Sequence, residues 1–333
     1  MKKASIVVSI PYQNNKLFDL DDLMINRDNC MFPFYLLKKE FEKLSIKLST
    51  QDINTFEDSD IIIYNDMPEE LPSAKDIEKS YLLIFESELI RPDNWDMEKH
   101  KFFKKIFTWK DDIVDNKKYF KFNFSQEIPL QINKDLRRKK KLCTLIAGHK
   151  LNNHSLELYS KRIEAIRWFE NNHLKDFDLY GIGWNQYSSS NKYINYILHK
   201  FKLASLFGPN YPSYKGKVDN KNTVLEKYKF TICYENGKDI PGYITEKIFD
   251  CFIAGSIPIY WGANNVEKHI PKNCFIDKKR FNTYEELYTF MTSMKEKTYL
   301  EYLDNIEIFL NSDSIKQFTS EYFSEVISRN ILK

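Results

Sequence analysis

Short, continuously apolar runs recur along this chain, and they constrain its fold more than any other feature of the sequence. A strand that is buried on both faces of a sheet has no solvated side and so needs no alternation of polar residues. In the first part of the chain such runs occupy residues 6–10, 60–64, 81–85 and 106–109. Residues 31–44 instead carry apolar side chains at helical spacing. This alternation predicts a parallel sheet that is covered by helices on both faces.

The same pattern starts again after a basic run at residues 137–141, which is typical of a solvated linker. Further buried strands are predicted at residues 142–147, 177–180, 228–234 and 257–261. Helical spacing follows at residues 158–170, 245–254, 284–294, 298–310 and 315–331. A chain of 333 residues is longer than one hydrophobic core usually grows. We therefore expect two Rossmann-like α/β domains that face each other across a cleft, at residues 1–138 and 139–310, and a C-terminal helix at residues 311–333.

The composition excludes several classes of protein. A formal net charge of +3 is too small to indicate nucleic acid as the main partner. No stretch approaches the roughly 20 apolar residues that a membrane-spanning helix needs. The five cysteines show no C-x-x-C spacing and mostly lie in apolar runs, as reduced core residues do. We expect a cytoplasmic protein that is at most peripherally associated with a membrane.

All nine glycines lie between Gly148 and Gly262, and four of them fall within residues 228–262. This segment predicts a strand, a polar loop, a helix that opens with charge and a second strand. Glu246 and Lys247 lie in the first turn of that helix, where a lysine opposes the helix dipole unless an anion binds there. Glu246 could accept hydrogen bonds from sugar hydroxyls. The alternative is ordinary first-turn polarity, with Thr245 as the N-cap.

A polar loop after Gly148 joins a predicted strand to a predicted helix, an arrangement that offers backbone N–H groups to an anion. Lys150 and Arg162 add positive charge to this region. The loop matches neither the G-x-G-x-x-G pattern nor the P-loop pattern, so the standard dinucleotide and P-loop interpretations lose support.

A carboxylate pair, Glu86 and Glu88, follows the apolar run at residues 81–85. A glutamate at the C-terminal end of a strand would point into the predicted cleft, where it could take a proton from an attacking hydroxyl. The alternative is a solvated strand end without a role in catalysis.

Taken together, residues 228–236, 242–247 and 254–262 resemble the donor-domain pattern of the α-1,3/4-fucosyltransferases of glycosyltransferase family 10. Weaker similarity extends to segments at residues 85–87, 106–109, 177–181 and 214–218. The resemblance implies a GT-B architecture, with an N-terminal acceptor domain and a C-terminal domain that binds GDP-β-L-fucose. It also implies inverting transfer of L-fucose to a hydroxyl of an acceptor glycan, on N-acetylglucosamine or glucose, in α-1,3 or α-1,4 linkage.

Position by position, the resemblance implies that Glu86 is the general base, with Glu88 as the alternative. It implies that Arg162 and Lys247 hold the diphosphate, and that Asn236, Tyr243 and Glu246 surround the nucleotide and the fucose. No D-x-D string falls in the donor segment, so we expect metal-independent transfer with no cofactor besides the donor substrate. The expected partners are GDP-fucose and an oligosaccharide or surface glycan, such as a lipopolysaccharide. Two alternatives remain open, the same fold with another nucleotide sugar and a catalytically inert sugar-nucleotide or glycan-binding module.

Overall fold

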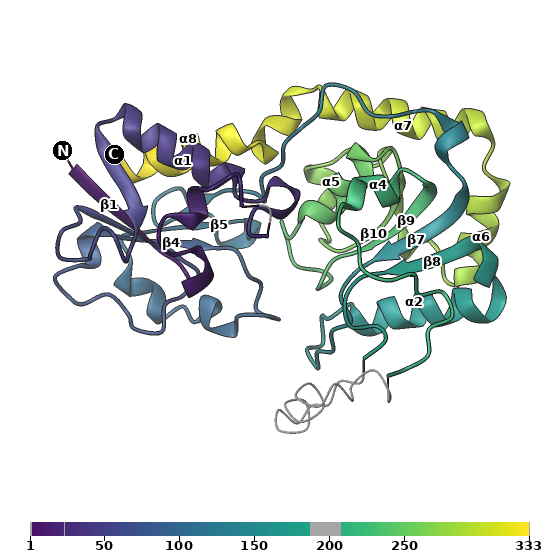
Figure 1. Cartoon of the computed structure of the whole chain (residues 1–333), viewed down its shortest axis with the longest axis horizontal. Coiled ribbons are helices and arrows are strands. Elements are labelled where there is room, and N and C mark those ends of the chain that lie inside the picture. Colours follow the sequence, from purple (N-terminus) through teal and green to yellow (C-terminus); the bar gives the residue numbers. More distant parts are fainter. Residues whose placement is uncertain (1, 23, 187–207, 333) are drawn as a thin grey trace.

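The computed structural model describes residues 2–22, 24–186 and 208–332. The described chain forms two α/β domains that lie side by side, each built on its own parallel sheet (Figure 1). The predicted fold class is therefore confirmed.

The sheet of the N-terminal domain has the order β2-β1-β3-β4-β5-β6, and every neighbouring pair is parallel. Its strands are β1 (Lys2–Val7), β2 (Ile46–Thr50), β3 (Ile61–Asn65), β4 (Ser80–Ile84), β5 (Lys105–Thr108) and β6 (Tyr119–Lys121). Helix α1 (Phe32–Lys43) lies where helical spacing predicted it. The first strand begins and ends earlier than predicted, because the chain turns into a short 3₁₀ helix at Ile10–Tyr12.

The sheet of the C-terminal domain has the order β11-β10-β9-β7-β8 and is also parallel. Its strands are β7 (Lys141–Ile146), β8 (Phe177–Tyr180), β9 (Tyr228–Tyr234), β10 (Ile257–Trp261) and β11 (Ile276–Asp277). The helices of this part are α2 (Tyr159–Asn172), α4 (Lys221–Leu225), α5 (Glu246–Ile253), α6 (Tyr284–Ser293) and α7 (Glu296–Leu310). The predicted strands at residues 177–180, 228–234 and 257–261 have these same bounds.

The end of the chain returns to the N-terminal domain. The helix predicted at residues 315–331 is instead a 3₁₀ helix, Asp313–Phe318, followed by α8 (Ser320–Leu332). The break occurs because the Thr319 hydroxyl accepts a hydrogen bond from the N–H of Tyr322 and so starts a new helix. Helix α8 lies beside α1 in Figure 1 and adds four side chains to the N-terminal core, those of Phe323, Val326, Ile327 and Ile331.

The C-terminal domain contacts the N-terminal domain through the loop before α5. Gly242 has a φ of 79°, and a Cβ at this position would lie 2.3 Å from the Trp109 carbonyl oxygen, so only glycine permits this approach. Beside it, the Asp111 carboxylate accepts hydrogen bonds from Asn265 at 2.6 Å and His269 at 2.7 Å. These contacts fix the orientation of the two domains.

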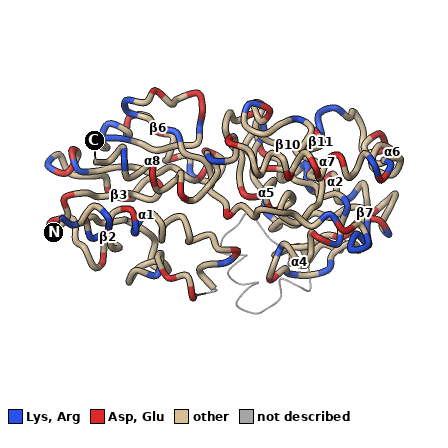
Figure 2. The backbone as a smooth tube through the Cα atoms, turned by 90° about the horizontal axis from the view of Figure 1, so that it is seen from above, with Lys and Arg blue, Asp and Glu red and all other residues tan. Residues whose placement is uncertain are grey.

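Charged residues of both signs are interspersed over the described parts of both domains (Figure 2). This mixture agrees with the small net charge. Within the described residues, no helix is both long and apolar enough to cross a membrane.

Candidate functional site

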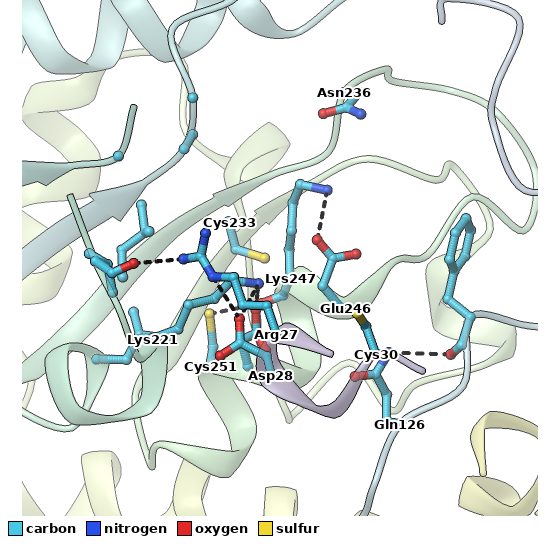
Figure 3. Close-up of a pocket in the computed structure, with 18 of the residues that line it drawn as sticks. Arg27, Asp28, Cys30, Gln126, Lys221, Cys233, Asn236, Glu246, Lys247 and Cys251 are labelled. Carbon is cyan, nitrogen blue, oxygen red and sulfur yellow. Dashed lines mark hydrogen bonds and ion pairs between the residues drawn. The ribbon is translucent and has the colours of Figure 1, made fainter. Parts of the chain in front are cut away.

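A cavity of about 680 Å³ lies between the two domains, within the range of small-molecule sites. The N-terminal domain contributes Phe85 and parts of residues 27–34 and 124–127 to its walls. The C-terminal domain contributes five of the predicted site residues, namely Lys150, Arg162, Asn236, Glu246 and Lys247. Residues that are far apart in the sequence therefore meet at the cleft where two facing α/β units were expected to bind a ligand (Figure 3).

The start of α5 is held by Glu235, a residue that sequence analysis did not assign to the site. Its carboxylate, at 0% exposure, accepts hydrogen bonds from the Thr245 N–H at 2.8 Å and the Thr245 hydroxyl at 2.7 Å. Lys247 Nζ lies 3.2 Å from the same carboxylate. Thr245 is the N-cap residue of α5, as the alternative expected, but its hydroxyl donates to Glu235 and makes no capping hydrogen bond.

Lys247 lies between two carboxylates in the first turn of α5. Its Nζ is 3.2 Å from Glu235 and 3.6 Å from Glu246, and Figure 3 shows it beside Glu246 in the cavity. Burial disfavours the ammonium, but the two carboxylates outweigh this effect and raise the pKa of Lys247. For Glu246, burial is in turn outweighed by Lys247 and Lys221, which lower its pKa to about 2. The first turn of α5 thus presents a fixed cation and a fixed carboxylate to the cavity.

Arg162 reaches the same region from the first turns of α2, and its side chain is buried. Its Nη2 donates to the backbone oxygens of Tyr234 at 2.7 Å and Glu235 at 2.8 Å. It also donates to Asn236 Oδ1 at 3.1 Å. Burial lowers the pKa of this guanidinium. Arg162 therefore fixes the end of β9 and the orientation of Asn236 while lining the cavity.

Tyr243 is not among the residues that line the cavity. It is buried between the domains, with its ring centroid 4.7 Å from that of Trp109. Its hydroxyl accepts a hydrogen bond from Asn236 Nδ2 at 3.3 Å. The contact with the sugar-nucleotide donor that the resemblance implied for Tyr243 stays a prediction. The packing of its ring against Trp109 joins the two domains.

Glu86 follows Phe85, which is part of the cavity wall, but Glu86 itself is not among the residues that line the cavity. Burial raises the pKa of its carboxyl, and Asp66 and Glu246 raise it further, while Lys150 and Lys247 act in the opposite direction. Within the described parts of the chain, the Glu86 carboxylate makes no hydrogen bond or ion pair. The alternative, Glu88, lies 3.9 Å from His154 Nε2. Glu86 therefore has the environment of a base with a raised pKa, and it responds to charges of the opposite domain.

A charged network that no local sequence pattern indicated also lines the cavity (Figure 3). Lys221 Nζ lies 2.7 Å from Asp250 and 3.8 Å from Asp28 of the N-terminal domain. Arg27 donates to the Val218 carbonyl oxygen at 2.7 Å. Burial raises the pKa of Asp250 to about 6, although Lys221 opposes the shift. Because Asp28 and Lys221 are almost two hundred positions apart, only the folded chain reveals this contact between domains.

Comparison with known proteins finds similarity in the C-terminal part of the chain. Residues 179–322 match the family model described as glycosyltransferase family 10 (fucosyltransferase), C-terminal part. An α-(1,3)-fucosyltransferase of Helicobacter pylori is 31% identical over 125 residues, which are 34% of this chain and 26% of that protein. An α-(1,4)-fucosyltransferase of Arabidopsis thaliana is 34% identical over 86 residues, which are 25% of this chain and 21% of that protein. These matches span about a quarter of each relative's length.

Solved structures resemble the whole chain. An α1,3-fucosyltransferase with GDP-fucose aligns with a TM-score of 0.53 and 15% identity, covering 100% of this chain and 90% of that one. Anabaena HepE, in complex with UDP and glucose, aligns with a TM-score of 0.55 and 8% identity, covering 100% of both chains. At these identities the likeness shows the fold, which is GT-B with two Rossmann-like domains.

Proposed function

We propose that this chain, whose residues 179–322 match the glycosyltransferase family 10 (fucosyltransferase) model, transfers L-fucose from GDP-β-L-fucose to a hydroxyl of an acceptor glycan. The names of the curated relatives support the sugar that is transferred. The acceptor we propose is an N-acetylglucosamine or glucose residue of an oligosaccharide or surface glycan, such as a lipopolysaccharide, linked α-1,3 or α-1,4.

One observation carries the proposal: Glu86, a half-buried carboxylate of the N-terminal domain, directly follows the cavity residue Phe85, and the rise in its pKa that burial causes is opposed by Lys150 and Lys247, two cations of the C-terminal domain that line the cavity. In the proposed reaction Glu86 takes the proton of the acceptor hydroxyl while the oxygen of that hydroxyl attacks the anomeric carbon of fucose. The bond from that carbon to the diphosphate breaks on the opposite face, so the configuration inverts. The leaving GDP carries away the electron pair and the developing negative charge.

The positive charge that the leaving group needs is available at α5. Lys247 lies in the first turn of this helix, where unpaired backbone N–H groups also favour an anion. Fixed donors of this kind lower a barrier because they are in place before the charge develops. We propose that Lys247, Lys150 and Arg162 stabilise the diphosphate, that Asn236, Tyr243 and Glu246 surround the nucleotide and fucose, and that no metal is obligatory.

A cytoplasmic location is also part of the proposal. All five cysteines are free thiols, and four of them are buried. Unpaired thiols are typical of a reducing compartment.

The test is transfer of radiolabelled fucose from GDP-fucose to a panel of disaccharides, with and without EDTA. We expect glycosidic product in both conditions. Product from UDP-glucose alone would reject fucose as the sugar and favour another nucleotide sugar. Binding of nucleotide without any turnover would favour an inert binding module. Loss of product with EDTA would refute only the metal-independent mechanism.

Two variants test the proposed roles. Glu86→Gln should lower kcat by at least about 100-fold, the usual contribution of a general base, and leave GDP affinity unchanged. Lys247→Ala should weaken both GDP binding and turnover. Glu88→Gln is the matched control for the first variant. If Glu88→Gln is inactive while Glu86→Gln transfers fucose normally, the base has been assigned to the wrong glutamate.

A further inference from the structure

The backbone of Phe85 and of Glu86, the proposed base, is hydrogen-bonded by side chains rather than by a neighbouring strand of the sheet. Strand β4 ends at Ile84, and the backbone of Phe85 and Glu86 leaves the ladder there. Both N–H groups donate to one oxygen, Oδ1 of Asp66, at 2.8 Å from Phe85 and 3.1 Å from Glu86. We propose that Asp66 is a positioning residue that fixes Glu86 and sets its basicity through its charge, an inference that rests on the proposed function.

The carbonyl groups of the same two residues are also bonded by side chains. Trp109 Nε1 donates to the Phe85 oxygen at 2.8 Å. Asn94 Nδ2 and Trp95 Nε1 each donate to the Glu86 oxygen at 3.2 Å. All four backbone polar groups of residues 85 and 86 therefore have side-chain partners. A loop needs no such arrangement to be stable in water, since exposed backbone groups can bind solvent instead.

Asp66 is itself fixed in an uncommon conformation. Its φ is 63°, in the left-handed region that aspartate tolerates better than most residues. Its N–H donates to the Leu83 oxygen at 2.8 Å and so extends the contact between β3 and β4 by one residue. Asn94, a fully buried side chain, donates to Asp66 Oδ1 at 2.8 Å and accepts from the Met67 N–H at 2.7 Å. The backbone of Asp66 is thus bonded to β4, and its carboxylate is bonded to Asn94.

The charges around Glu86 come from both domains. Burial is the main cause of its raised pKa, and Asp66 at the end of β3 is the next. Lys150 and Lys247 favour the carboxylate, whereas Glu246 disfavours it. Partial burial likewise raises the pKa of Asp66, while its three hydrogen bonds and the nearby Arg91 oppose that shift.

The sign of the effect of Asp66 on catalysis follows from its charge. A negative neighbour makes protonation of Glu86 easier, so Glu86 becomes a stronger base and needs a higher pH to remain ionised. A base is most effective when its pKa approaches the working pH. Removing the charge of Asp66 should therefore move the acid limb of kcat/KM to lower pH and reduce the plateau rate.

The geometry separates the charge of Asp66 from its hydrogen bonds. Because all three donors bind Oδ1, Asp66→Asn can keep the three bonds and lose only the charge. Asp66→Ala loses both. Asp115→Asn is a matched control, since Asp115 Oδ1 accepts three backbone N–H groups at 2.8 Å in the same domain but is not among the groups that shift the pKa of Glu86.

The experiment measures pH profiles of kcat/KM for these variants and titrates the Glu86 carboxyl by NMR with ¹³C-labelled glutamate. Glu86→Gln identifies the resonance. In Asp66→Asn we expect the acid limb and the titration of Glu86 to move down by about one pH unit. In Asp66→Ala we expect kcat to fall by about 10- to 100-fold while the KM for GDP-fucose is unchanged, as for a lost positioning contact. Asp115→Asn should match the wild type.

An unchanged titration of Glu86 in Asp66→Asn would overturn the proposal, and so would an equal shift in Asp115→Asn. Thermal unfolding of each variant shows whether the change is confined to the site. The titration needs no substrate, so it decides the role of Asp66 even if the wild-type chain transfers no fucose. Absence of transfer would refute the proposed function separately.

Discussion

The ion pair between Lys247 and Glu235 should be a main source of stability at the start of α5. Glu235 is fully buried, whereas the Lys247 side chain is 24% exposed. At 3.2 Å and an effective dielectric constant of about 20, two unit charges attract by about 5 kcal/mol. Partial exposure of Lys247 reduces this value. We expect Lys247→Met to lower the free energy of unfolding by about 3 kcal/mol, because it leaves a buried carboxylate without its cation.

A double-mutant cycle isolates this interaction. Glu235→Gln should also destabilise the protein, because it leaves the ammonium without its buried carboxylate. The double variant Glu235→Gln/Lys247→Met removes both charges and should lose at least about 2 kcal/mol less than the sum of the single losses.

The assay is urea unfolding at pH 7, monitored by tryptophan fluorescence. Lys161→Met is the control, because its ion pair with Glu164 is exposed and should contribute no more than about 1 kcal/mol. A loss below about 1 kcal/mol in Lys247→Met, or additive losses in the cycle, would refute the reasoning. In that case the two N–H and O–H donors of Thr245 would be sufficient for Glu235.

Two further predictions concern contacts between the N-terminal domain and later parts of the chain. Although burial raises the pKa of Asp111, His269 and Lys121 outweigh burial and lower it. At pH 7 the wild type should therefore have a free energy of unfolding about 2 kcal/mol higher than that of Asp111→Asn. This difference should decrease as the pH falls below about 4, where the carboxylate becomes protonated in the unfolded chain. A difference that is constant from pH 7 to pH 3 would contradict the prediction. Phe323→Ala in α8 should cost about 3–5 kcal/mol in urea unfolding, because its fully buried ring packs on Phe34 and Phe85. A loss no larger than that of Tyr35→Ala, at a half-buried side chain, would contradict it.

Two of the strands that sequence analysis missed, β2 and β6, are the edges of the N-terminal sheet. Strand β2 contains the exposed Lys47, and β6 has only three residues, with a single buried side chain, that of Phe120. The prediction depended on continuous apolar runs, which belong to central strands buried on both faces. Edge strands have one protected side and need no such run. The central strands β9 and β10 satisfied the assumption and were predicted with their observed bounds. Strand β8 lies at the edge of the C-terminal sheet, but its run Phe177–Leu179 is buried, and it was predicted with its observed bounds as well.

The candidate site was predictable where its residues share one segment. Asn236, Glu246 and Lys247 lie within twelve positions, and they line the same cavity. Asp66 gave no signal, because an aspartate after an apolar strand is ordinary and its partners are backbone groups about twenty residues away. The contact between Asp28 and Lys221 depends on how the domains are oriented, which periodicity does not encode.

The position of Glu86 depends on more of the chain than its own domain. The ring of Phe85 packs on Phe122 at 4.9 Å between centroids and on Phe323 of α8 at 6.0 Å. The Phe85 carbonyl accepts from Trp109, whose ring packs on Tyr243 of the C-terminal domain. Both the C-terminal helix and the loop before α5 therefore contact the support of Glu86. Since Lys247 lies four residues after Tyr243, one short segment positions the proposed cation directly and the proposed base through Trp109.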